Sequence, residues 1–458
     1  MSNESSPVRV SPRPQLGVTA PDVLVAGGGP AGCTAALAFA NAGARTALLD
    51  AAAPAARRLA GEWLHPPGVR ILERLGVDLS ATDHCRVAGF VVHPEDGSTP
   101  ITLPYSGGEL GMTFRHGALV RELRSTLARR RGVTLVSHAR ITGVRGTHVD
   151  YADADGSSAS CAPSEWLVGA EGRVSPTRRS LGVAPKPRQL SHMAGVLLEN
   201  VELPDAEYGH VLLGGPGPVL LYHIGPGVVR VCLDVPRRRG TPHGVRAYLW
   251  QTYSSWFPPT LRAAFGRALQ GEVCWAATQF RPRDHYGRGR VALVGDAVGC
   301  FHPLTAVGMT LAMADGECLV RSEDLGAYRR ERTAATQVAE ILSTLLHRVF
   351  TSRDPATEVL RHAVYDMWRR SPVERERTMA LLSTDETRVR KLGAAFLHTL
   401  ALAAREPSLR RPSSHDGPAW SSELLRGLGG WLSLLGMSTG HAAARRAAVR
   451  ARMTGPVR

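Results

Sequence analysis

Residues 295–310 place an acid, a His-Pro pair and a glycine before a helix, in an order that suits flavin binding. Asp296 follows a run of four apolar residues, which predicts a buried strand ending at this carboxylate. There it could accept hydrogen bonds from ribityl or ribose hydroxyls. Pro303 and Gly308 shape the turn, and the helix from about Met309 would point its N–H groups at a partial negative charge. The N1–C2=O region of a reduced flavin carries such a charge.

A glycine-rich turn near the start of the chain has the pattern of a pyrophosphate-binding loop. Residues 27–32 read GGGPAG, with an apolar strand before them and an alanine-rich helix after them. Gly27 permits the tight turn, Gly29 lets a pyrophosphate approach the backbone, and Gly32 allows close helix–strand packing. Asp50 ends the next predicted strand and is placed to bind a ribose hydroxyl. A lone GxGxxG is a weak signal, but this strand, helix and acid make it specific.

Residues 166–172 form a third predicted strand that runs into a glycine turn. Three separated strand ends converging on one ligand favour FAD over NAD, because FAD is the longer dinucleotide. The sequence contains no second GxGxxG run, so a nicotinamide cofactor would have no Rossmann domain of its own. NADH or NADPH is therefore expected to bind transiently as the electron donor, unless a separate reductase supplies the electrons.

Taken together, these motifs resemble the single-component FAD monooxygenases of the para-hydroxybenzoate hydroxylase fold, and within them the squalene epoxidase group. The resemblance covers roughly residues 20–405. The matching runs are RLAGEWLHPPG (58–68), EGRVSPTRRSL (171–181), GPVLLYHI (217–224), GDA (295–297) and HPLTAVGMT (302–310). The implied fold class is α/β, with a Rossmann-like FAD-binding domain, an antiparallel-sheet substrate domain and C-terminal helices. The C-terminal helices after residue 380 resemble the membrane-facing helices of that group.

The resemblance also implies which residues hold the cofactor and which surround the substrate. Implied FAD contacts, beside the glycines and turn residues above, are Pro30, Ala31, Asp50, Arg58, Trp63, Arg124, Asp296 and Met309. Expected substrate-pocket residues are His65, Phe90, Leu221, Tyr222, Phe301, Leu304 and Val307.

The sequence departs from the group at positions beside the expected flavin and pocket. Glu171 replaces an aspartate, and Ala306 with Val307 replaces two glycines, which would narrow that wall. His65 stands where the group has glutamine and Phe90 where it has tyrosine. Both polar partners lie on the pocket side in squalene epoxidases, so these changes argue against squalene itself as the substrate.

The expected reaction is transfer of one oxygen atom to an alkene. Reduced flavin and O₂ would form a C4a-hydroperoxide, and an alkene attacks its electrophilic distal oxygen without a general base. Consistent with this, the pocket candidates have no evident catalytic triad, metal cluster or carboxylate pair around them. His302 and Tyr222 are weak acid–base candidates. We expect His302 to be a structural residue bonding loop carbonyls, and Tyr222 to be a packing residue.

The leading hypothesis is therefore an FAD-dependent epoxidase acting on a lipophilic isoprenoid, such as a prenylated aromatic or polyketide metabolite, and a rearrangement of the product could follow. Alternatives on the same fold are an aromatic-ring hydroxylase, squalene epoxidase proper and a prenyl-chain reductase. A prenyl-binding chaperone without working flavin is a fourth, but the intact glycines and acids argue against it.

Composition excludes several other classes. The net charge of +15 comes almost wholly from arginine, spread over turns without interleaved aromatics, which argues against nucleic-acid binding. Seven scattered cysteines without a CxxC pair predict a reducing, cytoplasmic compartment. The stripes within 392–404 and 424–435 leave open a peripheral contact with the inner face of a membrane.

Five segments are predicted along the chain. Residues 1–20 are polar and proline-rich and are expected to be disordered. The FAD-binding domain is expected in two parts, 21–184 and 285–345, with the substrate sheet at 185–284 between them. Candidate strands in that sheet are 210–213, 218–224 and 228–235. Residues 346–458 are expected to be mainly helical.

Overall fold

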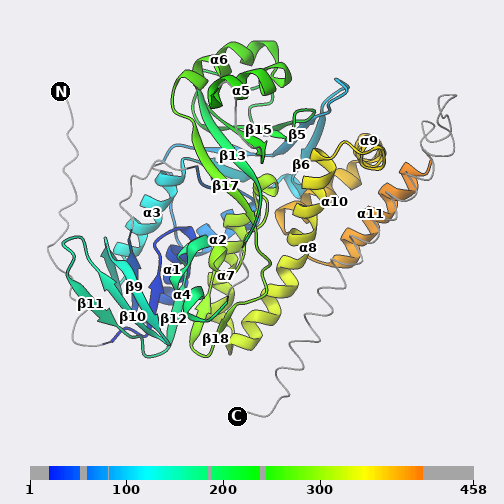
Figure 1. Cartoon of the computed structure of the whole chain (residues 1–458). Helices are drawn as coiled ribbons and strands as arrows, with labels where there is room; N and C mark the ends of the chain where they lie inside the picture. The colour runs from blue at the N-terminus through cyan, green and yellow to red at the C-terminus, as the bar shows by residue number, and fades with distance from the viewer. Residues whose placement is uncertain (1–19, 52–58, 81, 184–186, 238–243, 406–458) are drawn as a thin grey trace.

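The computed structural model describes residues 20–51, 59–80, 82–183, 187–237 and 244–405. A parallel sheet with its helices forms one half of the molecule, and a larger mixed sheet lies above it, between helices α5 and α6 at the top and helices α8–α11 at the side (Figure 1). This arrangement confirms the predicted α/β fold class. The disorder expected for the first residues, Arg58 and the 424–435 stripe lie outside the described residues.

The half of the molecule that contains the predicted FAD-binding motifs, here called the cofactor-type half, is built on a six-stranded sheet. Its strand order is β18-β19-β12-β1-β2-β8. All its pairings are parallel except that of β18 with β19. The strands are β1 (Val23–Ala26), β2 (Thr46–Asp50), β8 (Val133–Ser137), β12 (Trp166–Gly169), β18 (Gly287–Arg288) and β19 (Val291–Leu293). Both faces are covered, as a parallel sheet requires.

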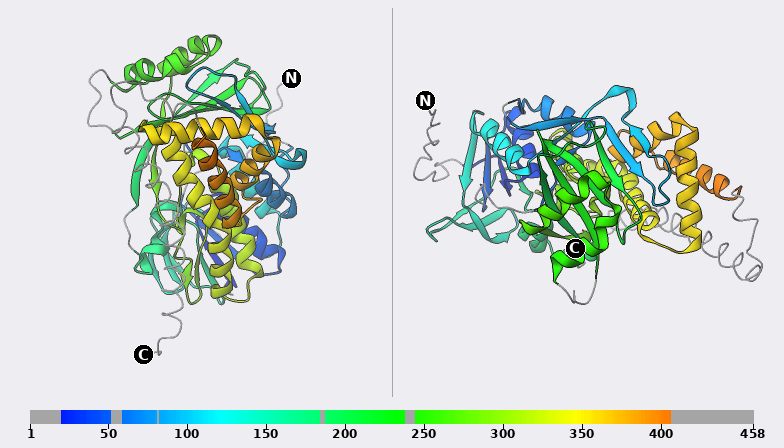
Figure 2. Two further views of the ribbon diagram at one scale, coloured as in Figure 1. Left: turned by 90° about the vertical axis from the view of Figure 1, so that its right-hand side faces the viewer. Right: turned by 90° about the horizontal axis from the view of Figure 1, so that it is seen from above.

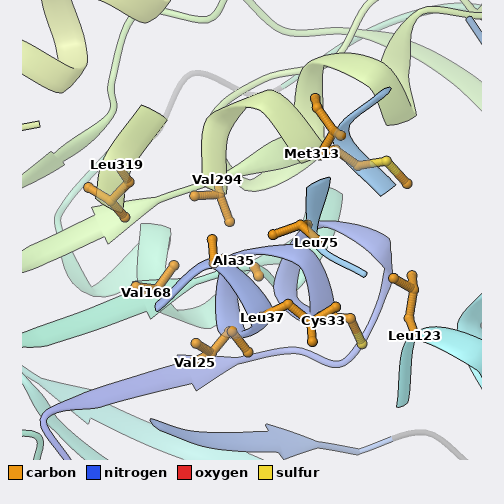
Figure 3. Close-up of a cluster of buried hydrophobic side chains, with 14 of the residues drawn as sticks. Val25, Cys33, Ala35, Leu37, Leu75, Leu123, Val168, Val294, Met313 and Leu319 are labelled. Carbon is orange, nitrogen blue, oxygen red and sulfur yellow. The ribbon is translucent and has the colours of Figure 1, made fainter. Parts of the chain in front are cut away.

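Alternate residues of each central strand enter different cores. Val23 and Val25 of β1 pack against α1 (Pro30–Asn41), α3 (His116–Ala128) and α7 (Gly308–Arg321), and part of this core is shown in Figure 3. Leu24 and Ala26 face the opposite core, beneath the three-stranded sheet of β9 (Arg140–Arg145), β10 (His148–Ala152) and β11 (Ser158–Cys161). Helices α1 and α7 pack side by side, so the two helix starts predicted to bind FAD lie in one layer.

The second sheet has seven strands in the order β17-β13-β16-β15-β14-β5-β6. They are β5 (Gly89–His93), β6 (Ile101–Pro104), β13 (Arg188–Glu199), β14 (Tyr208–Leu212), β15 (Val219–Gly225), β16 (Val228–Pro236) and β17 (Cys274–Phe280). The three strands expected from the sequence are confirmed within two residues. The sheet is not wholly antiparallel, because β14 pairs in parallel with β5. Strands β5 and β6 come from the segment assigned to the FAD-binding domain, so that boundary was drawn too simply.

Side-chain alternation along β15 corrects one pocket residue. Tyr222 enters the core shared with the C-terminal helices, whereas Leu221 packs on the other face, against α5 (Val245–Tyr253) and α6 (Pro259–Gln270). Neighbouring residues of a strand point to opposite faces, so both could not line one pocket. The prediction of Leu221 as a pocket residue was wrong.

Four helices close the open side of the seven-stranded sheet (Figure 2, left). They are α8 (Leu325–Thr351), α9 (Pro355–Arg370), α10 (Pro372–Ser383) and α11 (Val389–Ala403). Asp324, Asp354 and Ser371 cap the first three by accepting a backbone N–H through their side chains. The helical region thus begins at Leu325, earlier than the predicted residue 346.

The apolar stripe of α11 turns inward. Leu392 is buried, and Phe396 and Leu400 pack against the same core as α9 and α10. This stripe therefore stabilises the fold, while Leu397 on the opposite face is 60% exposed. Among the described helices, none is both long and apolar enough to cross a membrane.

Candidate cofactor and substrate site

The glycine turn after β1 has the contacts that a dinucleotide loop needs. Gly27 has a φ of +108°, and a Cβ there would lie 2.6 Å from the Ala170 carbonyl oxygen. A Cβ on Gly32 would lie only 1.8 Å from the Gly27 oxygen, so α1 can pack this closely only without a side chain. Gly29 differs, because no atom lies within 4 Å of its would-be Cβ. The loop is closed on its inner side and open at Gly29, where a pyrophosphate would approach.

Helices α1 and α7 both begin without a side-chain cap. Helix α1 begins at Pro30 after Gly29, and its first turn carries no acidic residue. Helix α7 begins at Gly308, close to the predicted position, and Val307 before it provides no side-chain cap. A Cβ on Gly308 would also meet no atom within 4 Å. Uncapped N–H groups carry partial positive charge, so both ends suit an anionic partner.

Asp50 ends β2 beside the glycine turn, where the sequence predicts a ribose-binding acid. Its carboxylate accepts a hydrogen bond from the Gly28 N–H at 3.2 Å and forms an ion pair with Arg124 of α3. Arg124 also donates to the Gly28 carbonyl oxygen at 3.0 Å. The structure thus brings together Asp50, Arg124 and the glycine turn, as expected from three distant motifs.

Asp296 occupies the turn after β19, and its carboxylate is half-buried. Among the described residues, no side chain or N–H donates a hydrogen bond to this carboxylate. Burial raises the pKa of Asp296, while the Arg173 and Arg283 guanidiniums oppose that shift. Arg178 fixes the same turn by donating to the Ala297 carbonyl oxygen at 3.1 Å. A sheltered carboxylate with its acceptors free fits ligand hydroxyls, so the residues present fit FAD.

A buried charge network holds the turn before Asp296 and was missed by sequence reasoning. Asp315 of α7 accepts the Gly295 N–H at 2.8 Å and the Arg332 Nε–H at 2.7 Å, and it pairs with Arg283. Arg283 in turn donates to the Gly295 carbonyl oxygen at 3.1 Å. The sequence did carry one signal, because Asp315 is an acid on an otherwise apolar helix face. A buried charge of this kind needs buried partners.

Glu171 stands where the group has an aspartate, and its longer side chain folds back onto the turn that follows it. It accepts hydrogen bonds from the Ser175 hydroxyl at 2.5 Å and from both the N–H and the hydroxyl of Thr177. These bonds order the start of the short helix α4 (Pro176–Ser180). Glu171 therefore stabilises the turn that follows β12, the third of the predicted strands.

Trp63 lies in the strand β3 (Trp63–Leu64) and packs against β5, β14 and β15 of the seven-stranded sheet. It is buried, stacks on Phe90 with ring centroids 4.5 Å apart, and meets the edge of Tyr222 at 5.5 Å. The Tyr222 hydroxyl reaches only the Cys232 sulfur, at 3.9 Å, and burial raises the pKa of Tyr222 well above its usual value. The expectation that Tyr222 is a packing residue is thus consistent with its surroundings.

His65 is fully buried and joins this aromatic group to the loop before α7. Its Nε2 lies 2.8 Å from the Thr305 carbonyl oxygen, which can only accept, so Nε2 carries the proton. Nδ1 then accepts from the Tyr105 hydroxyl at 2.6 Å, and the Tyr105 oxygen accepts the Trp63 indole N–H at 3.0 Å. Tyr105 thus supplies a buried hydroxyl between His65 and Trp63, a contact that no short motif reveals.

Burial lowers the pKa of His65 to about 4, from an ordinary value of 6.5. The unfolded chain therefore binds a proton between pH 6.5 and 4 that the folded protein does not, so stability falls as the pH falls through this range. From pH 7 to pH 5, His65 alone should cost about 2 kcal/mol. His65→Gln, which can make both bonds but does not titrate, should lose about that much less than the wild type in denaturant unfolding. Equal losses in the two proteins would contradict this prediction.

The hydrogen bonds of His302 differ from those expected. Its Nδ1 accepts the Leu304 N–H at 3.2 Å, so it caps the short helix η5 (Pro303–Thr305) and does not bond loop carbonyls. Its Nε2 faces Asp234 of β16 at 3.3 Å, and His347 of α8 lies against its ring. The sequence did not reveal this grouping of Asp234, His302 and His347, because β16 and α8 are distant in sequence.

The rest of the loop lies between the cofactor-type half and α8. Pro303 is exposed and Leu304 half-buried, and Ala306 adopts a left-handed conformation with a φ of +51°. Val307 packs with Leu311 and with Ala339 of α8, so it faces that helix. Met309 contacts the segment before Trp63, where a Cβ on Gly61 would lie 3.2 Å from the Met309 side chain.

Comparison with known proteins matches this geometry. The squalene epoxidase family model matches residues 165–406, more than half of the chain, and an FAD binding domain model matches residues 22–64. Squalene epoxidase 2, mitochondrial, of Arabidopsis thaliana is 32% identical over 416 residues, which cover 83% of this chain and 69% of that protein. Squalene monooxygenase SE2 of Panax ginseng is 29% identical over 414 residues, covering 83% and 74%.

Solved structures share the fold at lower identity. PqsL of Pseudomonas aeruginosa, described as a probable FAD-dependent monooxygenase, is 21% identical with a TM-score of 0.62, covering 73% of this chain and 97% of its own. HpxO of Klebsiella pneumoniae, solved with FAD and uric acid, is 22% identical with a TM-score of 0.59, covering 83% and 96%. The family match, the two relatives and the FAD domain agree: the chain belongs to the squalene epoxidase family and is an FAD-dependent monooxygenase.

Proposed function

We propose that this monooxygenase epoxidises an alkene of a lipophilic isoprenoid, in particular a prenylated aromatic or polyketide metabolite. The proposal is carried by His65, whose two nitrogens are both bonded and whose low pKa keeps it neutral. The imidazole next to the loop is therefore not available as a base. Alkene epoxidation needs none, whereas phenol activation does.

In this proposal the glycine turn and the start of α7 would hold FAD. The contacts assigned to it are Gly27, Gly29, Pro30, Ala31, Gly32, Asp50, Arg58, Trp63, Arg124, Asp296, Pro303, Gly308 and Met309. When bound and reduced, FAD supplies the electrons that activate O₂. NADH or NADPH is proposed as the donor, with a separate reductase if one is required.

The protein itself would position the reacting groups and keep water away from them. Phe90, Tyr222 and Ile224 belong to one buried apolar core with Leu342 and Leu345 of α8. Such walls exclude water from the reacting groups and hold a hydrocarbon by burial. Trp63 and Phe90, which stack on each other in this core, make part of that wall aromatic.

Two alternatives on the same site make different demands. An aromatic-ring hydroxylase needs a base at the substrate, and the His302–Asp234 pair is the nearest candidate by chemistry. Both His302 nitrogens are engaged, however, and both side chains are buried. A prenyl-chain reductase would use the same flavin without consuming O₂.

A competition assay tests the proposed substrate class. With squalene and a geranylated phenol at equal concentrations, we expect the geranylated phenol to be oxidised in preference, by roughly 5- to 150-fold, because a mismatched polar group in a buried site costs about 1–3 kcal/mol. His65→Gln combined with Phe90→Tyr should move the ratio towards squalene. Phe396→Tyr on α11 is the matched control and should leave the ratio unchanged. Faster oxidation of squalene by the wild type would instead indicate squalene epoxidase proper.

A further inference from the structure

The Asp234 carboxylate lies where three parts of the molecule meet. It belongs to β16 of the seven-stranded sheet and is 1% exposed. Its Oδ1 accepts the Ser191 hydroxyl of β13 and lies 3.3 Å from His302 Nε2 of the loop before α7. Its Oδ2 has no hydrogen-bond partner among the described residues and faces His347 Nε2 of α8 at 3.8 Å. One carboxylate thus connects the sheet, the loop and the longest described helix.

The tautomer of His302 decides what this cluster can do. The Leu304 N–H must donate to Nδ1, so in the neutral ring the proton is on Nε2, which donates to Asp234. A metal ion held by Asp234, His302 and His347 would need a free lone pair on that same Nε2. The backbone hydrogen bond therefore argues against a metal centre and for a fixed Asp–His hydrogen bond.

The backbone of Asp234 is held as firmly as its side chain. Its carbonyl oxygen accepts the Tyr253 hydroxyl of α5 at 2.7 Å, and its N–H donates to the Pro218 carbonyl oxygen at 3.1 Å. A Cβ on Gly217 would lie 2.3 Å from the Asp234 carbonyl oxygen, so the neighbouring turn also packs tightly here. Asp234 is accordingly a firmly held point on the sheet, to which the loop 302–307 is bonded through His302.

We propose that Asp234 is a positioning residue: acting through His302, it sets the position of the loop 302–307 against the flavin. His302 caps η5, and η5 leads directly into Ala306 and the uncapped start of α7. A shift of His302 would therefore move the peptide groups closest to the proposed flavin ring. The inference rests on the FAD placement proposed above, and it concerns the bound cofactor and not the substrate.

Flavin affinity and flavin circular dichroism test this role without any substrate. Asp234→Ala should weaken FAD binding about tenfold, because one charge-assisted hydrogen bond ordering the loop is lost, and should change the visible circular dichroism of the bound flavin. Asp234→Asn keeps an acceptor for His302 and should stay within about twofold of the wild type. His302→Asn can still cap η5 but cannot reach Asp234, so it should reproduce the Asp234→Ala spectrum.

Glu95→Ala is the matched control. Glu95 follows β5 of the same sheet, but its carboxylate bonds Arg361 and Tyr365 of α9. It should lower the melting temperature and leave the flavin spectrum and affinity unchanged. Wild-type affinity and spectrum in Asp234→Ala, or the same flavin changes in Glu95→Ala, would overturn the proposal. A failure of epoxidation would leave this result untouched, so the two proposals fail separately.

Discussion

Replacing Asp296 with alanine is expected to give a protein that folds but purifies almost colourless. The Asp296 carboxylate is sheltered, and no described residue donates a hydrogen bond to it, so its acceptors are available to ligand hydroxyls. A hydrogen bond to a charged group contributes about 1.5–3 kcal/mol, which corresponds to roughly 10- to 150-fold weaker FAD binding. Titration of the apoprotein with FAD, followed by flavin fluorescence, measures this loss.

Two further variants separate the role of this carboxylate from general damage. Asp296→Asn keeps one acceptor oxygen and should recover part of the affinity. Asp366→Ala removes a carboxylate that pairs with Arg370 on the surface of α9, far from the glycine turn in the fold, and should bind FAD as the wild type does. If Asp296→Ala retained full FAD absorbance, the assignment of this half of the site would be wrong.

Local sequence patterns predicted much of the fold and part of the site. Alternating apolar residues and glycine turns predicted β14, β15 and β16 within two residues, because these signals depend only on neighbours in the chain. The glycine turn could likewise be interpreted position by position, and the contacts of Gly27, Gly29 and Gly32 agree with the roles assigned to them.

What the sequence left open depends on contacts between distant segments. Alternation along a strand shows that Leu221 and Tyr222 point to opposite faces of the sheet. It does not show which of the two faces packs against α8, so the position of Tyr222 could not be predicted. Tyr105 reaches His65 across 40 positions, and Asp234 reaches His302 across 68. The parallel pairing of β14 with β5 similarly joins segments that the sequence assigned to different domains.

The Tyr105 hydroxyl changes the interpretation of the departures from the family. The sequence alone suggested that His65 and Phe90 remove a polar pair from the pocket wall. In the folded protein the Tyr105 hydroxyl, just after β6, is bonded to both His65 and Trp63. His65 therefore keeps a buried polar partner, and Phe90 packs against the Trp63 ring.

Oxygen-isotope labelling tests the proposed epoxidation most directly. The purified holoprotein would be supplied with NADH or NADPH, a reductase if one is required, ¹⁸O₂ and a prenylated aromatic substrate. Because no free base lies at His65 and the walls are apolar, oxygen transfer to an alkene is the reaction that this site supports best. Mass spectrometry with fragmentation locates the label in the product.

We expect one ¹⁸O atom per product molecule, carried on a former alkene carbon, and no label when the reductant is omitted. The Asp296→Ala variant should lose this product in proportion to its lost flavin, which ties the oxygen transfer to the proposed site. A product labelled on the aromatic ring would contradict epoxidation and indicate the ring hydroxylase. An unlabelled product with a saturated prenyl chain would contradict oxygen transfer altogether.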